Sequence, residues 1–234
     1  MMGNPFDERA EQVRQNIMQI KQNMYTACQD VGRDPAEVQL MAVTKTVPAE
    51  LVNIAIQEGI TLLGENRAQE LLQKYDVYTA KDQIHFIGHL QRNKVKSIID
   101  KVCMIESVGS VELADEIEKQ AAKHGLIMPC LVEVNIGKQA SKSGVMPEQA
   151  AWLIQKISSY AHLSVQGLMS IPPIEGSAAY FEKLHQLYID IKQQNIDNVN
   201  MHVLSMGMSA DYAEAIRHGS TLIRIGTAMF GKRN

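Results

Sequence analysis

Residues 38–45 have the sequence VQLMAVTK, a short apolar run that ends abruptly at Thr44 and Lys45. A run of this length, preceded by the GRDP break at residues 32–35, is typical of a strand buried on both faces of a parallel sheet. We therefore expect a strand over residues 38–43, with Lys45 at the point where the chain leaves it. The helix that follows is expected at about 49–58.

The same alternation of short apolar runs and amphipathic segments continues to the C-terminus. Before the first strand, Val13, Ile17, Ile20 and Met24 recur at helical spacing and predict an extra N-terminal helix over residues 6–31. Strands are expected at 38–43, 60–63, 84–87, 102–105, 130–134, 163–168, 201–204 and 222–225. Helices are expected between them, the best defined at 111–124, 147–158, 178–194 and 210–218.

Strands that alternate with helices pair in parallel through right-handed crossovers, and eight such units in 234 residues favour a closed (β/α)₈ barrel. An open doubly wound sheet is the alternative. A dinucleotide-binding sheet would carry a Gly-x-Gly-x-x-Gly turn after its first strand, and residues 44–48 contain no glycine. No linker or internal repeat divides the chain, so we predict one α/β barrel domain over residues 1–234.

The charge balance argues against nucleic acid and membrane as main partners. Lys and Arg number 23 against 26 Asp and Glu, and this net charge of −3 provides no basic stripe. Residues 1–14 mix acidic and basic side chains without an apolar run, so we expect no signal peptide or membrane anchor and a cytoplasmic location. Cys28, Cys103 and Cys130 show no metal-binding or disulfide spacing and are expected to be buried thiols.

In a barrel of this kind the functional face is built from residues that follow the strands, and phosphate groups often lie on the last two loops. Lys45 follows the first strand. It either extends from the barrel mouth into solvent or is desolvated enough to form a Schiff base with an aldehyde. Placement alone leaves both interpretations open.

The loops after the seventh and eighth strands carry small and hydroxyl residues. Ser205 and Ser209 flank the first of them, where Ser209 is expected to cap the helix at 210–218 and to leave backbone N–H groups for an anion. Gly226 and Thr227 follow the last strand. These residues predict a phosphate site, although an ordinary helix cap and a strand-ending glycine explain each motif taken singly.

Arg224 lies within the apolar strand LIRI at 222–225, so its charge needs an acceptor inside the barrel. An aromatic nitrogen or a carboxylate of a ligand would serve, and a structural carboxylate within the barrel is the alternative.

Seven strings taken together resemble the pyridoxal phosphate homeostasis proteins, the YggS/PROSC family. They are AVTKT at 42–46, GEN at 64–66, HFIGHLQRNK at 85–94, SKSG at 141–144, GLM at 167–169, SMGMS at 205–209 and RIGT at 224–227. Each string is weak by itself, but the seven occur in one order from about residue 10 to the C-terminus. The resemblance implies a single barrel similar to the N-terminal domain of alanine racemase.

The resemblance also implies a cofactor, pyridoxal 5′-phosphate (PLP), and roles for individual residues. Lys45 would be the Schiff-base lysine, and Arg224 the partner of the pyridine nitrogen. Where the family commonly has serine before this lysine, the chain has Thr44, a conservative hydroxyl change. The remaining cofactor-binding residues implied are Asn66, which alternatively caps the helix that follows it, and Ser205, Ser209, Gly226 and Thr227.

Two of the strings stay without an assigned role. Lys142 in SKSG is a second lysine near the mouth or a solvated loop residue. His85, within residues 85–94, is more typical of a satisfied core histidine than of a catalyst.

We therefore expect a PLP-binding protein of intracellular vitamin B6 homeostasis, a carrier or buffer with no robust catalysis and no catalytic or metal-binding residues. Candidate acceptors are apo forms of PLP-dependent enzymes, and the family suggests a monomer or weak dimer. The alternatives are a PLP-dependent amino-acid racemase or related enzyme, and an interaction protein in which the cofactor is only structural.

Overall fold

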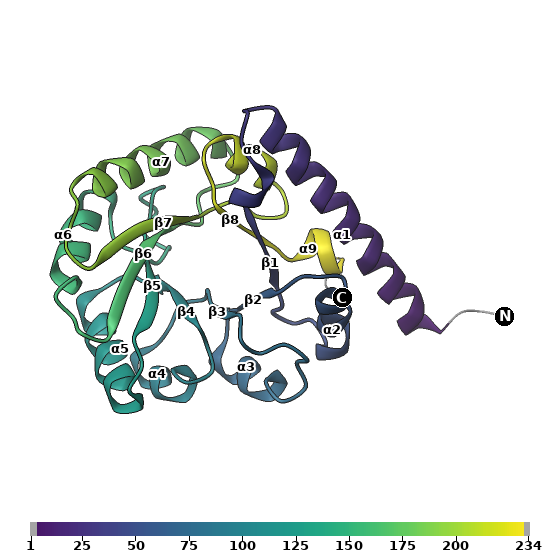
Figure 1. Ribbon diagram of the computed structural model, residues 1–234, viewed down its shortest axis with the longest axis horizontal. Helices are drawn as coiled ribbons and strands as arrows, with labels where there is room; N and C mark the ends of the chain where they lie inside the picture. The colour runs from purple at the N-terminus through teal and green to yellow at the C-terminus, as the bar shows by residue number, and fades with distance from the viewer. Residues whose placement is uncertain (1–3, 232–234) are drawn as a thin grey trace.

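In the computed structural model, which describes residues 4–231, strand β1 (Gln39–Val43) pairs in parallel with both β2 and β8. The second pairing places Met41 opposite Arg224 and closes the sheet into a barrel with strand order β1 to β8 (Figure 1). The predicted (β/α)₈ barrel is therefore confirmed. The other strands are β2 (Leu62–Glu65), β3 (Ile84–Phe86), β4 (Met104–Val108), β5 (Met128–Glu133), β6 (Leu163–Met169), β7 (Val199–Ser205) and β8 (Leu222–Ile225).

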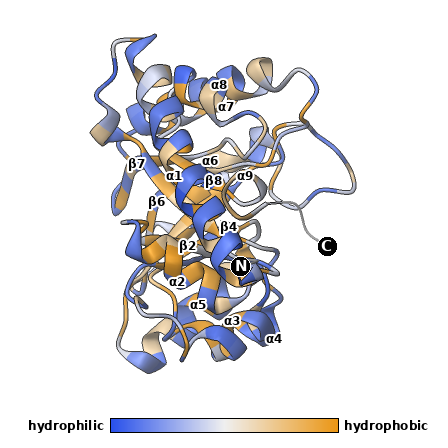
Figure 2. Ribbon diagram, turned by 90° about the vertical axis from the view of Figure 1, so that its right-hand side faces the viewer, coloured by the Kyte–Doolittle hydropathy of each residue, from blue (hydrophilic) through white to orange (hydrophobic). Residues whose placement is uncertain are grey.

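Helices surround this barrel on the outside (Figure 1). They are α1 (Pro5–Gln29), η1 (Pro35–Glu37), α2 (Ala49–Gln57), α3 (Ala68–Lys74), α4 (Arg92–Ile98), α5 (Val111–His124), α6 (Pro147–Ile157), α7 (Ser177–Gln193), α8 (Tyr212–Arg217) and α9 (Thr227–Phe230). Hydrophilic and hydrophobic stretches alternate along the helices (Figure 2), and the buried apolar residues form the main core between the helices and the strands.

A second, smaller apolar cluster lies inside the barrel. Each strand points alternate side chains inward, so the barrel interior is filled by side chains rather than being a channel. The apolar members are Met41, Val43, Leu62, Ile87, Met104, Leu131, Met169, Val203 and Leu222. Buried polar side chains, among them His85, Glu106, Ser205 and Arg224, lie on the same strands, and a binding site in this fold belongs at the carboxyl ends of the strands.

Strand β2 begins and ends two residues later than expected, and the shift matters for the site. Gly64 is part of the strand rather than of a turn, because its missing side chain makes room for Met41. A Cβ on Gly64 would lie 2.4 Å from the Met41 sulfur. Consequently Glu65 is a fully buried strand residue and Asn66 is the first residue after the strand.

The predicted N-terminal helix is present as α1, and its buried side includes Val13, Ile17, Ile20 and Met24 as the spacing indicated. It packs along α2, α8 and α9 on one side of the barrel (Figures 1 and 2). The Asn16 side chain donates to the carbonyl of Met229 at 2.9 Å and so attaches α1 to α9. The extra helix thus braces the segment that follows β8.

Residues 1–3 and 232–234 of the predicted 1–234 domain lie outside the described residues. Within residues 4–231 no helix is long and apolar enough to cross a membrane. In the same part of the chain, no group of three or more His, Cys, Asp or Glu side chains is placed to hold a metal ion. Cys28 and Cys130 are buried as expected, whereas Cys103 is only partly so.

Candidate functional site

The loops at the carboxyl ends of the strands enclose a pocket of about 230 Å³, here named the lysine pocket. Its apolar wall is formed by Val43, Ile87, Ile171, Ile174, Met208 and Ala210. The barrel brings residues from distant parts of the sequence together here because all parallel strands end on one face. The other lining residues are six of the seven predicted from the sequence to bind cofactor: Lys45, Asn66, Ser209, Arg224, Gly226 and Thr227.

The predicted phosphate site is held together differently from the expectation. Ser209 does not cap the helix that follows it, because α8 begins only at Tyr212 and Asp211 precedes it. Instead the Ser209 hydroxyl oxygen accepts hydrogen bonds from the backbone N–H groups of Gly226 at 3.2 Å and Ala228 at 3.1 Å. Ser209 thus joins the β7 loop to the β8 loop, and residues of both loops line the pocket.

Arg224 extends from β8 into the barrel and is 3% exposed. Its guanidinium donates to the Ser205 hydroxyl at 2.5 Å and to the Ser170 carbonyl at 2.8 Å. Ser205 therefore differs from the expectation of a phosphate contact: it is fully buried beneath the pocket, and its position on the inner face of β7 makes it a partner of Arg224. The groups that accept hydrogen bonds from the buried Arg224 guanidinium are thus supplied by the protein itself.

The partners of Arg224 continue across the barrel to a fully buried carboxylate. Ser205 donates to Glu106 Oε2 at 2.6 Å, and His85 Nδ1 lies 2.6 Å from Glu106 Oε1. Burial by itself would raise the pKa of Glu106, but the hydrogen bond and charge of His85 and the charge of Arg224 lower it. We name this set, Arg224, Ser205, Glu106 and His85, the arginine network.

His85 is the core histidine that the sequence favoured, since it is 6% exposed. Burial lowers its pKa, but hydrogen bonding with Cys103 and Glu106 and the charge of Glu106 outweigh this and raise the pKa to about 9. His85 is therefore a cation at neutral pH that neutralises Glu106 from the side opposite Arg224.

Asn66 lies at the pocket wall but caps no helix, because α3 starts at Ala68 and has no side-chain cap. Its Oδ1 atom is buried without a hydrogen-bond partner in the protein. The loop after β3 presses against the same residue, and a Cβ on Gly88 would lie 2.1 Å from the Asn66 carbonyl oxygen. A buried acceptor with no partner is costly, so this atom is suited to a ligand donor.

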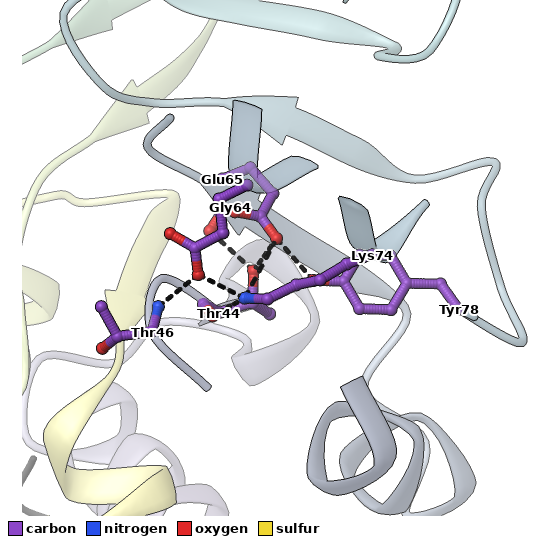
Figure 3. Close-up of polar contacts among 7 residues, drawn as sticks. Thr44, Thr46, Gly64, Glu65, Lys74 and Tyr78 are labelled. Carbon is purple, nitrogen blue, oxygen red and sulfur yellow. Dashed lines mark hydrogen bonds and ion pairs between the residues drawn. The ribbon is translucent and has the colours of Figure 1, made fainter. Parts of the chain in front are cut away.

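Sequence reasoning missed a second buried network, which surrounds the carboxylate of Glu65 (Figure 3). Glu65 Oε1 accepts hydrogen bonds from the Thr44 hydroxyl at 2.8 Å and from the Tyr78 hydroxyl. Lys74 Nζ lies 3.9 Å from the same oxygen. Burial raises the pKa of Glu65, opposed by these hydrogen bonds and by the charge of Lys74. We name Thr44, Glu65, Lys74 and Tyr78, with Glu70, the glutamate network.

One signal of this network was present in the sequence. Glu65 follows the apolar run of the second strand, just as Arg224 interrupts the last one, and a charge in such a place needs a partner. Its partners are Lys74, the last residue of α3, and Tyr78, which follows that helix, and no local pattern marks them.

Two strings without an assigned role meet beside the lysine pocket. His89 and its neighbours after β3, together with Ser143 and Gly144 of the SKSG loop, line a separate pocket of about 730 Å³. Ser143 donates to Glu133 at 2.7 Å in its wall. Lys142 itself is exposed and does not line the lysine pocket.

Comparison with known proteins gives consistent matches over nearly the whole chain. Residues 15–234 match the model of the alanine racemase N-terminal domain. A relative from Aquifex aeolicus (strain VF5), named pyridoxal phosphate homeostasis protein, is 39% identical, with 94% of this chain and 97% of the relative covered. The match confirms the resemblance found in the sequence strings.

Two solved structures share the fold closely. A structure described as an unknown protein from Bifidobacterium adolescentis superposes with a TM-score of 0.88 at 31% identity, covering 95% of this chain and 96% of that one. PipY from Synechococcus elongatus PCC7942, solved with PLP bound, superposes with a TM-score of 0.80 at 27% identity, covering 94% and 100%.

Proposed function

The chain belongs to the family of pyridoxal phosphate homeostasis proteins, and we propose that it binds PLP in the lysine pocket as a carrier or buffer in vitamin B6 homeostasis. The observation that carries this proposal is the pocket itself. A lysine, a buried arginine, an asparagine and two hydroxyl side chains line one small cavity at the functional end of the barrel.

The lining residues fit the chemical groups of PLP. When bound, PLP supplies an aldehyde that an amine can attack, with loss of water, to form a C=N bond. Lys45 is the amine in the pocket. The hydroxyls of Ser209 and Thr227, next to Gly226, are suited to a phosphate group, and the unpartnered Asn66 oxygen is suited to a hydroxyl donor. We assign the ring nitrogen to Arg224.

Arg224 also favours a binding role over catalysis. A permanent cation beside the ring nitrogen disfavours its protonation and weakens the ring as an electron sink. Racemisation needs, in addition, an acid–base group on the opposite face of the substrate. Among residues 4–231, those that line the lysine pocket carry only two ionisable side chains, Lys45 and Arg224. The racemase alternative is thus less favoured than the carrier.

The physiological setting follows from this role. We propose a cytoplasmic, single-domain protein of residues 1–234 that is a monomer or weak dimer and passes PLP to apo forms of PLP-dependent enzymes.

The decisive test is spectroscopic and chemical. Purified protein loaded with PLP is expected to absorb visible light, and borohydride reduction followed by peptide mapping should place the adduct on Lys45. Lys45→Ala should abolish the band, and Lys142→Ala serves as the matched control. An adduct found solely on another lysine would refute the assignment. Turnover is tested separately by deuterium exchange at the α-carbon of common amino acids, which is expected to stay near the level of free cofactor.

A further inference from the structure

Lys45 is joined to the chain by two peptide groups, and a single ion pair on α3 holds both of them (Figure 3). Lys74 Nζ donates to the carbonyl oxygen of Thr44 at 2.8 Å. Glu70 Oε1 accepts hydrogen bonds from the backbone N–H of Thr46 and from Lys74 Nζ. The Thr44 carbonyl belongs to the peptide group before Lys45, and the Thr46 N–H belongs to the peptide group after it.

The backbone at this point needs such support. Regular pairing of β1 ends where Thr44 N donates to the Gly64 carbonyl at 3.0 Å. Two residues later, Thr46 has a φ of 60°, in the left-handed region that β-branched residues rarely adopt. A conformation of this kind persists only where its surroundings hold it. The hydrogen bond from Thr46 to Glu70 is a contact that does so.

The ion pair is itself anchored in the core. Lys74 lies 3.9 Å from the buried Glu65 carboxylate, which also accepts a hydrogen bond from the Thr44 side chain. The side chains of Lys74 and Glu70 are 14% and 15% exposed, so solvent competes little for them. The two residues are therefore fixed before any ligand arrives, and they transmit the rigidity of the core to Lys45.

We propose that Lys74 and Glu70 are positioning residues for the reaction of Lys45 with the PLP aldehyde, because together they clamp the two peptide groups that flank Lys45. The inference rests on the proposed function, since it takes Lys45 as the amine that reacts. Neither residue lines the lysine pocket, so neither is expected to contribute to non-covalent binding.

Positioning has a kinetic signature. Misplacement of a reacting group by about 1 Å can cost roughly a hundredfold in rate, whereas contacts to the rest of the ligand are unaffected. Loss of the clamp should therefore slow the covalent step without weakening the binding of an analogue that lacks the aldehyde. A role in stability alone would predict an unchanged rate of the covalent step, or equal losses of that rate and of analogue affinity.

The experiment uses the full-length apoprotein and the variants Lys74→Met, Glu70→Gln and the double variant. Stopped-flow absorbance after mixing with excess PLP gives the limiting rate of the covalent step. Equilibrium binding of 4-deoxypyridoxine 5′-phosphate, which has no aldehyde, gives the non-covalent affinity. We expect the limiting rate to fall about tenfold or more in each single variant, with little further loss in the double variant, because the pair acts as one unit. Analogue affinity should stay within about twofold of wild type.

Two further variants sharpen the test. Lys74→Arg keeps a cation that can donate to Thr44 and Glu70 and should restore part of the rate. Lys119→Met removes a more exposed ion pair on α5, with Glu116, far from Lys45 in the sequence, and should leave the rate unchanged.

The outcomes separate the two proposals. An unchanged limiting rate in both single variants, or a loss of rate matched by an equal loss of analogue affinity, would overturn the clamp while leaving PLP binding intact. Failure of the wild-type protein to form an adduct on Lys45 would instead overturn the proposed function, and the clamp with it.

Discussion

The barrel contains two fully buried glutamates, Glu65 on β2 and Glu106 on β4, whose surroundings differ. Glu106 lies between two cations, His85 directly and Arg224 through Ser205. Glu65 receives neutral hydroxyl donors, and the cationic Lys74 lies 3.9 Å away. The pKa of Glu106 is lowered accordingly, and that of Glu65 is raised by burial.

The difference shows that partners, rather than depth of burial, decide whether a buried carboxylate carries its charge easily. It also separates two tasks at the mouth of the barrel. The arginine network fixes a charge under the lysine pocket, whereas the glutamate network fixes the backbone that presents Lys45. Four measurements test this division, beginning with the largest effect.

Removal of the Glu106 charge should be the most damaging change. Glu106→Gln removes the buried carboxylate that faces Arg224 and keeps His85 protonated, and breaking a buried pair in this way costs about 3–5 kcal/mol. The free energy of unfolding in urea measures this loss. Glu11→Gln, which removes a surface partner of Arg14, should change it by less than about 1 kcal/mol. A Glu106→Gln protein as stable as wild type would show that Glu106 is not needed to balance the two cations.

The pH dependence of stability should reveal His85. Its pKa is raised from 6.5 to about 9 on folding, so its stabilising contribution is complete below pH 6.5 and is lost as the pH rises toward 9. The loss amounts to at most about 3 kcal/mol. Urea unfolding between pH 6 and 9 should show this decline in wild type and in a His202→Gln control. His85→Gln should flatten it, and a slope that survives His85→Gln would have another origin.

The fold was predictable because its signals are local. Apolar runs such as residues 38–43 mark strands directly, and the helix at α1 was visible in the spacing of its apolar residues. The β2 boundary was wrong by two residues because Gly64 and Glu65 look like turn residues until the neighbouring Met41 is known. The presence of each strand could be predicted from its apolar residues, whereas the end of β2 depends on a contact with the neighbouring strand β1.

The sequence predicted which residues form the site but not the hydrogen bonds that hold them. Strand ends placed Lys45, Asn66 and Arg224 on one face, but their partners could not be read from the sequence. Ser205 bonds to Glu106, which is 99 residues away, and Ser209 bonds to backbone groups of a different loop. Such contacts depend on how the barrel closes and leave no periodic pattern along the chain.

Removal of the Ser205 hydroxyl, which links Arg224 to Glu106, should have a smaller effect on stability and on PLP affinity. Ser205→Ala removes the hydroxyl between Arg224 and Glu106, and a lost hydrogen bond of this kind costs about 1 kcal/mol, or roughly fivefold in PLP affinity if it orients Arg224. Ser170→Ala is the matched control, since Arg224 bonds to its backbone carbonyl, which the substitution retains. Equal PLP affinities in the two variants would show that Ser205 does not orient Arg224.

The smallest effect on stability is expected for Glu65→Gln, and its dependence on pH should have the opposite sign to that of Glu106→Gln. A carboxyl whose pKa is raised on folding stabilises the protein below its ordinary value of 4.5, and this contribution is lost as the pH rises through the folded-state pKa. Glu65→Gln cannot acquire that buried charge, so its stability relative to wild type should improve with rising pH. At pH 7 the two proteins should differ by less than about 1 kcal/mol, because the amide oxygen still accepts from Thr44 and Tyr78.

The same urea titration applied to Glu106→Gln supplies the contrast. The native carboxylate of Glu106 stabilises the protein above the ordinary pKa of 4.5, and that contribution disappears as the pH falls through its lowered folded-state pKa. The disadvantage of Glu106→Gln should therefore grow as the pH rises toward 4.5, whereas Glu65→Gln should gain on wild type as the pH rises above 4.5. Parallel pH profiles for the two variants would mean that burial alone governs both carboxylates, and the distinction between the two networks would have to be abandoned.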